Sequence, residues 1–203
     1  MRLMQRVCPL AVVVSALFAT NVSAETIATF ADPALDGSTP LFSLVGNQLS
    51  GGWSGPNLDL LTPGLPVTPN ISNATFTMTP LTATLIATDF YSLNAGEIKF
   101  FDASNTLVFD ITFQSATLAT NIGIGASDLA LQDVSFAAPL EAQTTTFSNE
   151  RFAFSFANDV VLPQDGKTWT ASFTSSSTVI PEPASAGLLA GGGVLIGLLR
   201  RRR

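Results

Sequence analysis

The sequence predicts an all-β protein, built as an antiparallel β-sandwich, with a β-barrel as the alternative. Apolar residues alternate with small or polar residues in segments such as 109–113, 152–156 and 169–173, which is the pattern of half-buried strands. Polar turn residues separate these segments, and a helical period is almost absent. With 203 residues, the chain fits one domain of ordinary size.

The N-terminus, residues 1–24, indicates a secretory signal peptide. Arg2 and Arg6 precede a mostly apolar run from Val7 to Phe18, and small residues at 22–24 match a cleavage position after Ala24. The run is shorter than the roughly 20 residues that a membrane-spanning helix needs. We therefore predict export, with an uncleaved N-terminal anchor as the weaker alternative.

Residues 25–173 are expected to form one exported domain of strands joined by loops. The stretch 32–69 holds six prolines and six glycines, which predicts irregular loops with short strands, arranged as a flap over one sheet edge. The run 74–79 alternates apolar residues with three threonines until Pro80 interrupts it, so we expect a strand there.

Two β-hairpins are predicted from turn chemistry. The first joins 98–101 to 107–113 through five polar or small turn residues. The second joins 152–162 to 168–174, where a proline opens the turn and Asp-Gly closes it. Between the hairpins, Ser127 is suited to cap one or two helical turns.

The exported domain is strongly acidic. Residues 25–180 contain fourteen Asp and Glu residues but only Lys99, Arg151 and Lys167 as bases, a net charge near −11. This charge repels phosphate backbones and anionic headgroups, which disfavours nucleic-acid binding and peripheral membrane docking. The chain has no His, and its only Cys is Cys8, which excludes imidazole bases, the usual zinc sites and an internal disulfide framework.

The C-terminal region indicates a tail that reaches a membrane. A Ser- and Thr-rich run predicts a flexible spacer at 174–179. The tail, 180–203, contains sixteen mostly apolar residues, 184–199, followed by four arginines. At about 1.5 Å per residue these span a bilayer core only when the arginines snorkel. The arginines place the chain end in the cytoplasm and the domain outside.

The tail resembles the PEP-CTERM sorting signal of Gram-negative bacteria that make exopolysaccharide. The resemblance is confined to the tail and consists of Pro181-Glu182-Pro183, the short Gly- and Leu-rich span, and the cluster Arg200, Arg201, Arg202 and Arg203. It implies that an exosortase, an integral-membrane transpeptidase, recognises the triplet and that the arginines retain the tail until processing. The implied destination is the cell surface or the extracellular, biofilm matrix. A plain C-terminal membrane anchor is the alternative.

Candidate sites within the domain are few. Trp53, which lies among Gly51, Gly52, Ser54 and Gly55, is a candidate glycan contact, although packing is the favoured interpretation. Glu97, Glu141 and Glu150 are the candidate carboxylates for a glycoside hydrolase, which needs two facing acids.

The sequence gives little support for a metal site, and it places the second tryptophan in the core. The acid pairs Asp32 with Asp36 and Asp128 with Asp133 lack the spacing of an EF-hand calcium loop, so solvated surface acids are favoured. Trp169 alternates with Ala171 and Phe173 and is expected in the core.

These observations predict an exported, non-enzymatic structural or glycan-contacting domain with no catalytic residue, metal or cofactor. Its expected partners are the exosortase and exopolysaccharide. A secreted polysaccharide hydrolase and a calcium-stabilised adhesion module are the two alternatives.

Overall fold

The structure, a computed structural model, describes residues 24–65, 70–138, 146–163 and 166–180. These residues form thirteen β-strands and one 3₁₀ turn, without an α-helix among them. In chain order, the elements are β1 (Ala24–Phe30), β2 (Phe42–Val45), β3 (Gln48–Trp53), β4 (Thr75–Met78), β5 (Leu81–Ala87), β6 (Phe90–Leu93), β7 (Gly96–Phe101), β8 (Leu107–Phe113), β9 (Ala116–Ala119), β10 (Gly123–Ser127), η1 (Asp128–Ala130), β11 (Ser135–Ala137), β12 (Thr146–Leu162) and β13 (Gly166–Ile180). The prediction of an all-β, antiparallel protein is confirmed.

Eight of the strands close into an antiparallel barrel. Around the ring the order is β13, β12, β10, β9, β6, β5, β3 and β2, and β2 pairs again with β13. The ring closes because β2 has a partner on each edge: Phe42 lies opposite Trp169 of β13 and opposite Gly51 of β3. The barrel alternative therefore fits the strand order.

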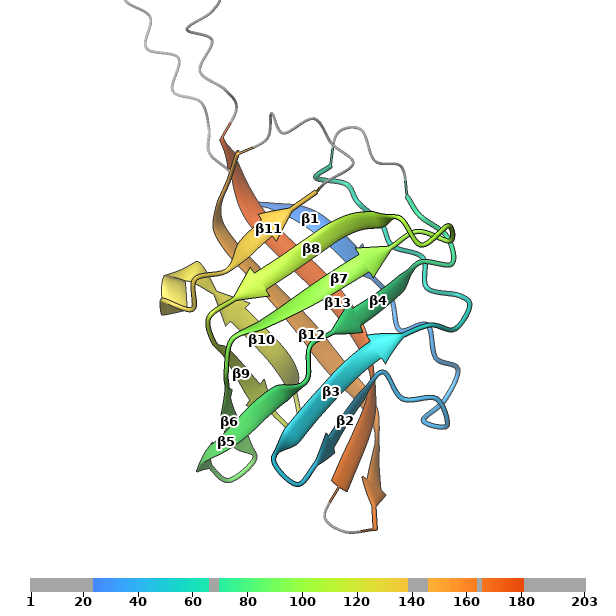
Figure 1. Cartoon of the computed structure of the whole chain (residues 1–203), viewed down its shortest axis with the longest axis vertical. Coiled ribbons are helices and arrows are strands. Elements are labelled where there is room, and N and C mark those ends of the chain that lie inside the picture. The colour runs from blue at the N-terminus through green and yellow to red at the C-terminus, as the bar shows by residue number, and fades with distance from the viewer. Residues whose placement is uncertain (1–23, 66–69, 139–145, 164–165, 181–203) are drawn as a thin grey trace, which may run out of the picture.

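The two-sheet sandwich, our first expectation, needs correction because β3 joins both layers. Its first residues, Gln48 and Leu49, pair with β5, whereas Gly52 and Trp53 pair with β4. From β4 a second ladder runs through β7 and β8 to β11, and Figure 1 shows it crossing in front of β12 and β13. All thirteen strands therefore belong to one connected sheet that curls over itself.

Aromatic side chains fill the space between the ring and the second layer. The ring centre of Phe100 on β7 lies 5.0 Å from that of Phe173 on β13, which lies 4.8 Å from that of Phe154 on β12. All three side chains are buried, and each such burial stabilises the fold by about 1.5–3 kcal/mol. This core fixes β12 and β13 from the inside, so their outer faces have a rigid support.

Two inward-facing serines of β13 complete the ladders where neighbouring strands bulge. β1 bulges just before Ala28, and the Ser175 hydroxyl accepts from the Ala28 N–H and donates to its carbonyl, both at 3.1 Å. β12 bulges just after Ser148, whose N–H donates to the Ser177 hydroxyl at 3.0 Å and whose carbonyl accepts from it at 2.9 Å. Each hydroxyl replaces a backbone partner that the extra residue displaces.

The prediction of a flexible spacer at 174–179 is therefore wrong, because these residues belong to β13. Ser175 and Ser177 are each 1% exposed, and Thr174 pairs with both β12 and β1. Threonine and serine indicate a flexible linker by composition, but the same residues suit a strand when neighbours supply backbone partners. The paired sheet continues to Ile180, beyond the expected boundary at residue 173.

The predicted strand at 74–79 and both predicted hairpins are present as β4, β7–β8 and β12–β13. In the first hairpin, the Asp102 carboxylate accepts from the N–H groups of Ser104 and Thr106, both at 2.8 Å. Ser127 caps η1, as expected, by accepting from the Leu129 N–H at 3.2 Å.

The described part of the stretch 32–69 contains the short strands β2 and β3, as expected, and these close the barrel between β13 and β5. Residues after β3 also cover one sheet edge, as expected, because Leu61 exchanges two backbone hydrogen bonds of 2.8 Å with Thr29 of the edge strand β1.

Candidate functional site

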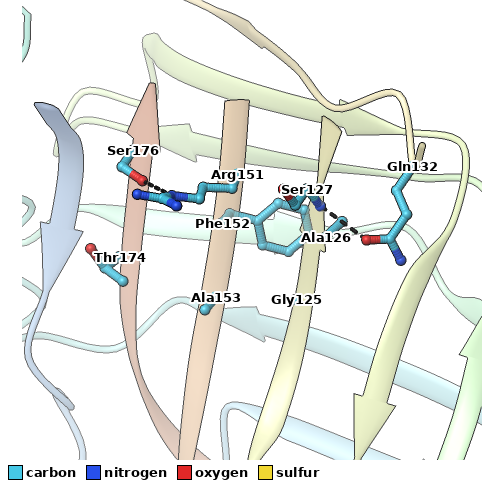
Figure 2. Close-up of a pocket in the computed structure, with 9 residues that line it drawn as sticks. All are labelled: Gly125, Ala126, Ser127, Gln132, Arg151, Phe152, Ala153, Thr174 and Ser176. Atoms are coloured by element: carbon cyan, nitrogen blue, oxygen red, sulfur yellow. Dashed lines mark hydrogen bonds between the residues drawn. The ribbon is translucent and has the colours of Figure 1, made fainter. Parts of the chain in front are cut away.

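A groove crosses the outer face of β10, β12 and β13 (Figure 2). Its volume is ≈ 370 Å³, at the lower end of the range of about 300–1,000 Å³ found for small-molecule sites. The lining residues are Gly125, Ala126, Ser127, Gln132, Arg151, Phe152, Ala153, Thr174 and Ser176. We call this hollow the Arg151 groove.

The floor of the Arg151 groove is low because three neighbouring strands place small residues side by side. Gly125 of β10 pairs with Ala153 of β12, which pairs with Thr174 of β13. Strand alternation turns these positions away from the aromatic core. A Cβ added to Gly125 would lie 3.0 Å from the carbonyl oxygen of Phe152, so even alanine fits there poorly.

Polar side chains stand on both sides of this floor, as Figure 2 shows. On the β13 side, Nε of Arg151 donates to Oγ of Ser176 at 2.7 Å. On the β10 side, Oε1 of Gln132 accepts from the Ser127 N–H at 3.0 Å, and Nε2 of Gln132 donates to Oγ1 of Thr117 at 3.4 Å. These hydrogen bonds orient the two long side chains.

Arg151 differs from the two lysines of the exported domain. Nζ of Lys99 lies 2.8 Å from a carboxylate oxygen of Glu97, and Nζ of Lys167 lies 3.8 Å from one of Asp89. Among the described residues, the Arg151 guanidinium forms no ion pair. The described part of the domain therefore supplies no carboxylate partner for the positive charge that Arg151 brings to the groove.

A short segment between β10 and β11 supports the Gln132 side of the groove. Asp128 anchors it, because its carboxylate accepts from the Val134 N–H at 2.7 Å and from the Glu150 N–H at 3.0 Å. Leu131 has a φ of 55°, a left-handed conformation that costs a non-glycine residue about 1 kcal/mol or more. The Asp128 hydrogen bonds offset this strain and thereby position Gln132.

Glu150 is a buried carboxylate next to this segment. It is 8% exposed, and its Oε1 accepts from the Phe136 N–H at 3.3 Å. Burial raises the pKa of Glu150 to about 7; the Phe136 hydrogen bond opposes this rise, and the Asp128 charge adds to it. This pKa places the titration of Glu150 close to neutral pH.

Trp53 is mostly enclosed by its own loop. It is 8% exposed, its Nε1 donates to the Pro56 carbonyl at 3.2 Å, and a Cβ on Gly55 would lie 2.8 Å from its ring. Trp53 also lines two hollows of ≈ 570 and ≈ 250 Å³, so a glycan contact there stays a prediction. Trp169 is 1% exposed and packs in the core, as expected.

The three carboxylates considered for hydrolysis have different surroundings. Glu97 lies on the outer face of β7 and pairs with Lys99. Glu150 is buried against Phe136, and Glu141 lies outside the described residues. The described part of the chain therefore shows no facing pair formed by Glu97 and Glu150.

The acids considered for calcium binding bond to nearby backbone groups. Asp36 accepts from the Ser38 N–H at 2.8 Å, and hydrogen bonds from Ser38 lower the pKa of Asp36. Asp32 accepts from the Ala34 N–H at 3.0 Å. Over the described ranges, no group of three or more His, Cys, Asp or Glu side chains is placed to hold a metal ion.

The export and sorting features fall almost entirely outside the described residues. Ala24, the expected cleavage residue, is the first residue of β1, whereas Pro181, Glu182, Pro183 and the arginines 200–203 lie beyond the described ranges. Within those ranges, the structure contains no helix with the length and apolar character needed to cross a bilayer. The signal peptide and sorting tail stay predictions from the sequence.

No protein-family model matches the chain, and no curated protein or solved structure is significantly similar to it.

Proposed function

We propose that the chain is an exported, non-enzymatic barrel domain that contacts a saccharide through the Arg151 groove. The groove itself is the observation that supports this most: a shallow floor of small residues lies between two polar side chains that are already held by hydrogen bonds. Saccharides combine hydroxyl groups with C–H faces, and such a floor and rim suit both. The described residues that line the groove include no carboxylate, histidine or cysteine, which favours binding over catalysis.

The proposed location rests on the resemblance of the tail to the PEP-CTERM signal. In this proposal, the tail holds the protein in the inner membrane until an exosortase acts at Pro181-Glu182-Pro183. The domain then reaches the cell surface or the exopolysaccharide matrix. Replacing the triplet by alanines tests this: we expect loss of release and accumulation of the full-length membrane form, whereas unchanged release would contradict it.

Filling the groove tests the binding surface. Ala153→Leu places a larger side chain on the floor, so we expect weaker binding to soluble polysaccharides, measured by affinity electrophoresis against dextran and polygalacturonate. Thr84→Leu is the matched control because Thr84 is an exposed, outward-facing residue of β5 outside the groove. Equal binding by both variants and the unaltered protein, or no binding to either polymer, would contradict the proposed function.

A carboxylate-dependent polysaccharide hydrolase is the second candidate, and the raised pKa of Glu150 favours it. A general acid that works near neutral pH needs such a pKa. However, Glu150 is not among the described residues that line the Arg151 groove, so a substrate bound there would not contact its carboxylate. Release of reducing ends from polygalacturonate that disappears in Glu150→Gln would support the hydrolase and count against a purely binding role.

A further inference from the structure

We infer that the occupant of the Arg151 groove is an acidic saccharide and that Arg151 binds the carboxylate of a uronic-acid residue. This inference rests on the proposed function and specifies its ligand class. It combines three observations: an arginine without a carboxylate partner among the described residues, a serine that orients this arginine, and a small-residue floor beside it.

The guanidinium of Arg151 is fixed and still has donors to offer. A guanidinium carries five N–H donors, and the hydrogen bond to Ser176 uses the one on Nε. Ser176 is the cross-strand partner of Arg151 in the β12–β13 ladder, so the sheet itself sets this contact. The Nη donors match the spacing of two carboxylate oxygens, which favours a bidentate pair over a contact with a neutral hydroxyl.

The acidic composition of the domain makes it unusual for an arginine to have no carboxylate partner among the described residues. Fourteen acids are present for three bases between residues 25 and 180, and both lysines have carboxylate partners. The carboxylate of Asp128, in the segment that carries Gln132, accepts hydrogen bonds from two backbone N–H groups. The charge on Arg151 is thus complementary to an anion from outside the domain.

The negative net charge of the domain does not exclude such a ligand. The Debye length is about 8 Å at physiological ionic strength, so remote acids are largely screened while a contact with Arg151 is not. The acidic surroundings therefore reduce the encounter rate of a polyanion more than they weaken the contact itself.

The floor of the Arg151 groove offers few contacts that would distinguish one sugar from another, so we expect the charge of Arg151 to determine the preference for an acidic saccharide. Among the described lining residues, Phe152 is the one aromatic, and it is 3% exposed, so it offers a sugar ring no stacking platform. Gly125 and Ala153 contribute small, apolar positions to the floor, and Gln132 lies on the opposite side of the groove from Arg151 (Figure 2). A neutral sugar would gain few directional contacts here, whereas a carboxylate gains a charge-assisted pair.

The test compares two polymers that differ only in the carboxylate. The purified protein is titrated calorimetrically with polygalacturonate and with its methyl ester, in which the acid is masked. We expect polygalacturonate to bind and the ester to bind at least about tenfold more weakly, as the loss of a charged hydrogen-bonded pair predicts. Arg151→Gln should produce a loss of similar size, and Arg151→Lys a smaller one because lysine keeps the charge but not the bidentate fork.

Lys99→Gln is the matched control, since it removes the same charge from a different surface and should leave binding unchanged. Equal affinity for the acid and the ester, with both weakened by Ala153→Leu, would overturn the acidic ligand but leave the proposed saccharide contact standing. No binding to either polymer would overturn both. Self-association of the protein that Arg151→Gln abolishes would show that a carboxylate of a second copy is the occupant instead, and would likewise overturn this inference.

Discussion

The outer faces of β7–β8 and of β12–β13 cover the same aromatic core but differ in how their charges are compensated. On β7–β8, Lys99 lies 2.8 Å from Glu97 and pairs across the ladder with Asp110. On β12–β13, Arg151 has a serine as its partner and stands beside a hollow. Among the described residues, Lys99 on the first face has a carboxylate partner, whereas Arg151 on the second face has none. The proposed site is therefore indicated by a basic side chain without a carboxylate partner, rather than by the number of charges on a face.

The largest expected effect concerns the buried acid near the groove. The folded pKa of Glu150, about 7, lies above its ordinary value of 4.5, so ionisation opposes folding. Stability from this group is fully present below pH 4.5, falls as the pH rises toward 7 and does not recover above it. Glu150→Gln removes this loss, and we expect it to stabilise the protein by up to about 3 kcal/mol at pH 8.

Urea unfolding of both proteins between pH 4 and pH 8 measures this effect as the difference between two curves. Glu97→Gln is the control, because Glu97 is partly exposed and pairs with Lys99 on the other face. A difference between Glu150→Gln and the unaltered protein that stays constant over this range would show that Glu150 is not buried as the structure has it.

The next effect contrasts two aspartates, one near each face. Asp128→Ala leaves the N–H groups of Val134 and Glu150 without an acceptor, and we expect a loss of about 2 kcal/mol in the free energy of unfolding. Asp110→Ala should cost less, because burial and Glu97 raise the pKa of Asp110 and so disfavour its charged form. Thermal unfolding of the two variants at one pH compares them, and equal losses would remove the special role of Asp128.

Two adjacent serines of β13 give a smaller contrast. Ser177→Ala removes the hydroxyl that bonds both backbone groups of Ser148 at the β12 bulge, which should destabilise the fold by about 1–2 kcal/mol. Ser176 faces outward, and Ser176→Ala removes the hydrogen-bond acceptor of Arg151. We therefore expect this variant to keep its free energy of unfolding nearly unchanged but to bind polygalacturonate more weakly. The reverse pattern would mean that inward and outward positions on this strand are assigned wrongly.

The smallest expected effect is on the compensated face. Lys99→Gln breaks the partly exposed pair with Glu97, for which we expect a stability change below about 1 kcal/mol. Removing Lys99 also takes away the charge that lowers the pKa of Asp110, so this pKa should rise further. An NMR titration of the Asp110 carboxyl checks the direction, and an unchanged pKa would place Lys99 farther from Asp110 than described.

Local structure could be predicted from the sequence because it depends on neighbouring residues. The turn at Asp102, the cap at Ser127 and the alternating strands at 74–79 and 152–156 each follow from residues a few positions apart. Ring closure could not, because it depends on two short ladders between distant segments. One pairs Gln48 and Leu49 of β3 with β5, and the other pairs β2 with β13.

The end of β13 and the groove were missed for a related reason. The run 174–178 is polar in composition, and its burial depends on bulges in β1 and β12 that no local pattern shows. The groove needs small residues at 125, 153 and 174 in one register across three strands. The only signal in the sequence was that Arg151 is one of three bases in an acidic domain.

We propose that an acidic saccharide binds in the Arg151 groove, on the outer face of β10, β12 and β13. Backbone amide chemical shifts, followed by NMR during titration with polygalacturonate, test it most directly. We expect the changes to concentrate at the backbone amides of Gly125, Ala153, Thr174 and Arg151. Changes centred on Trp53 or on Lys99, with the groove amides unmoved, would contradict the account.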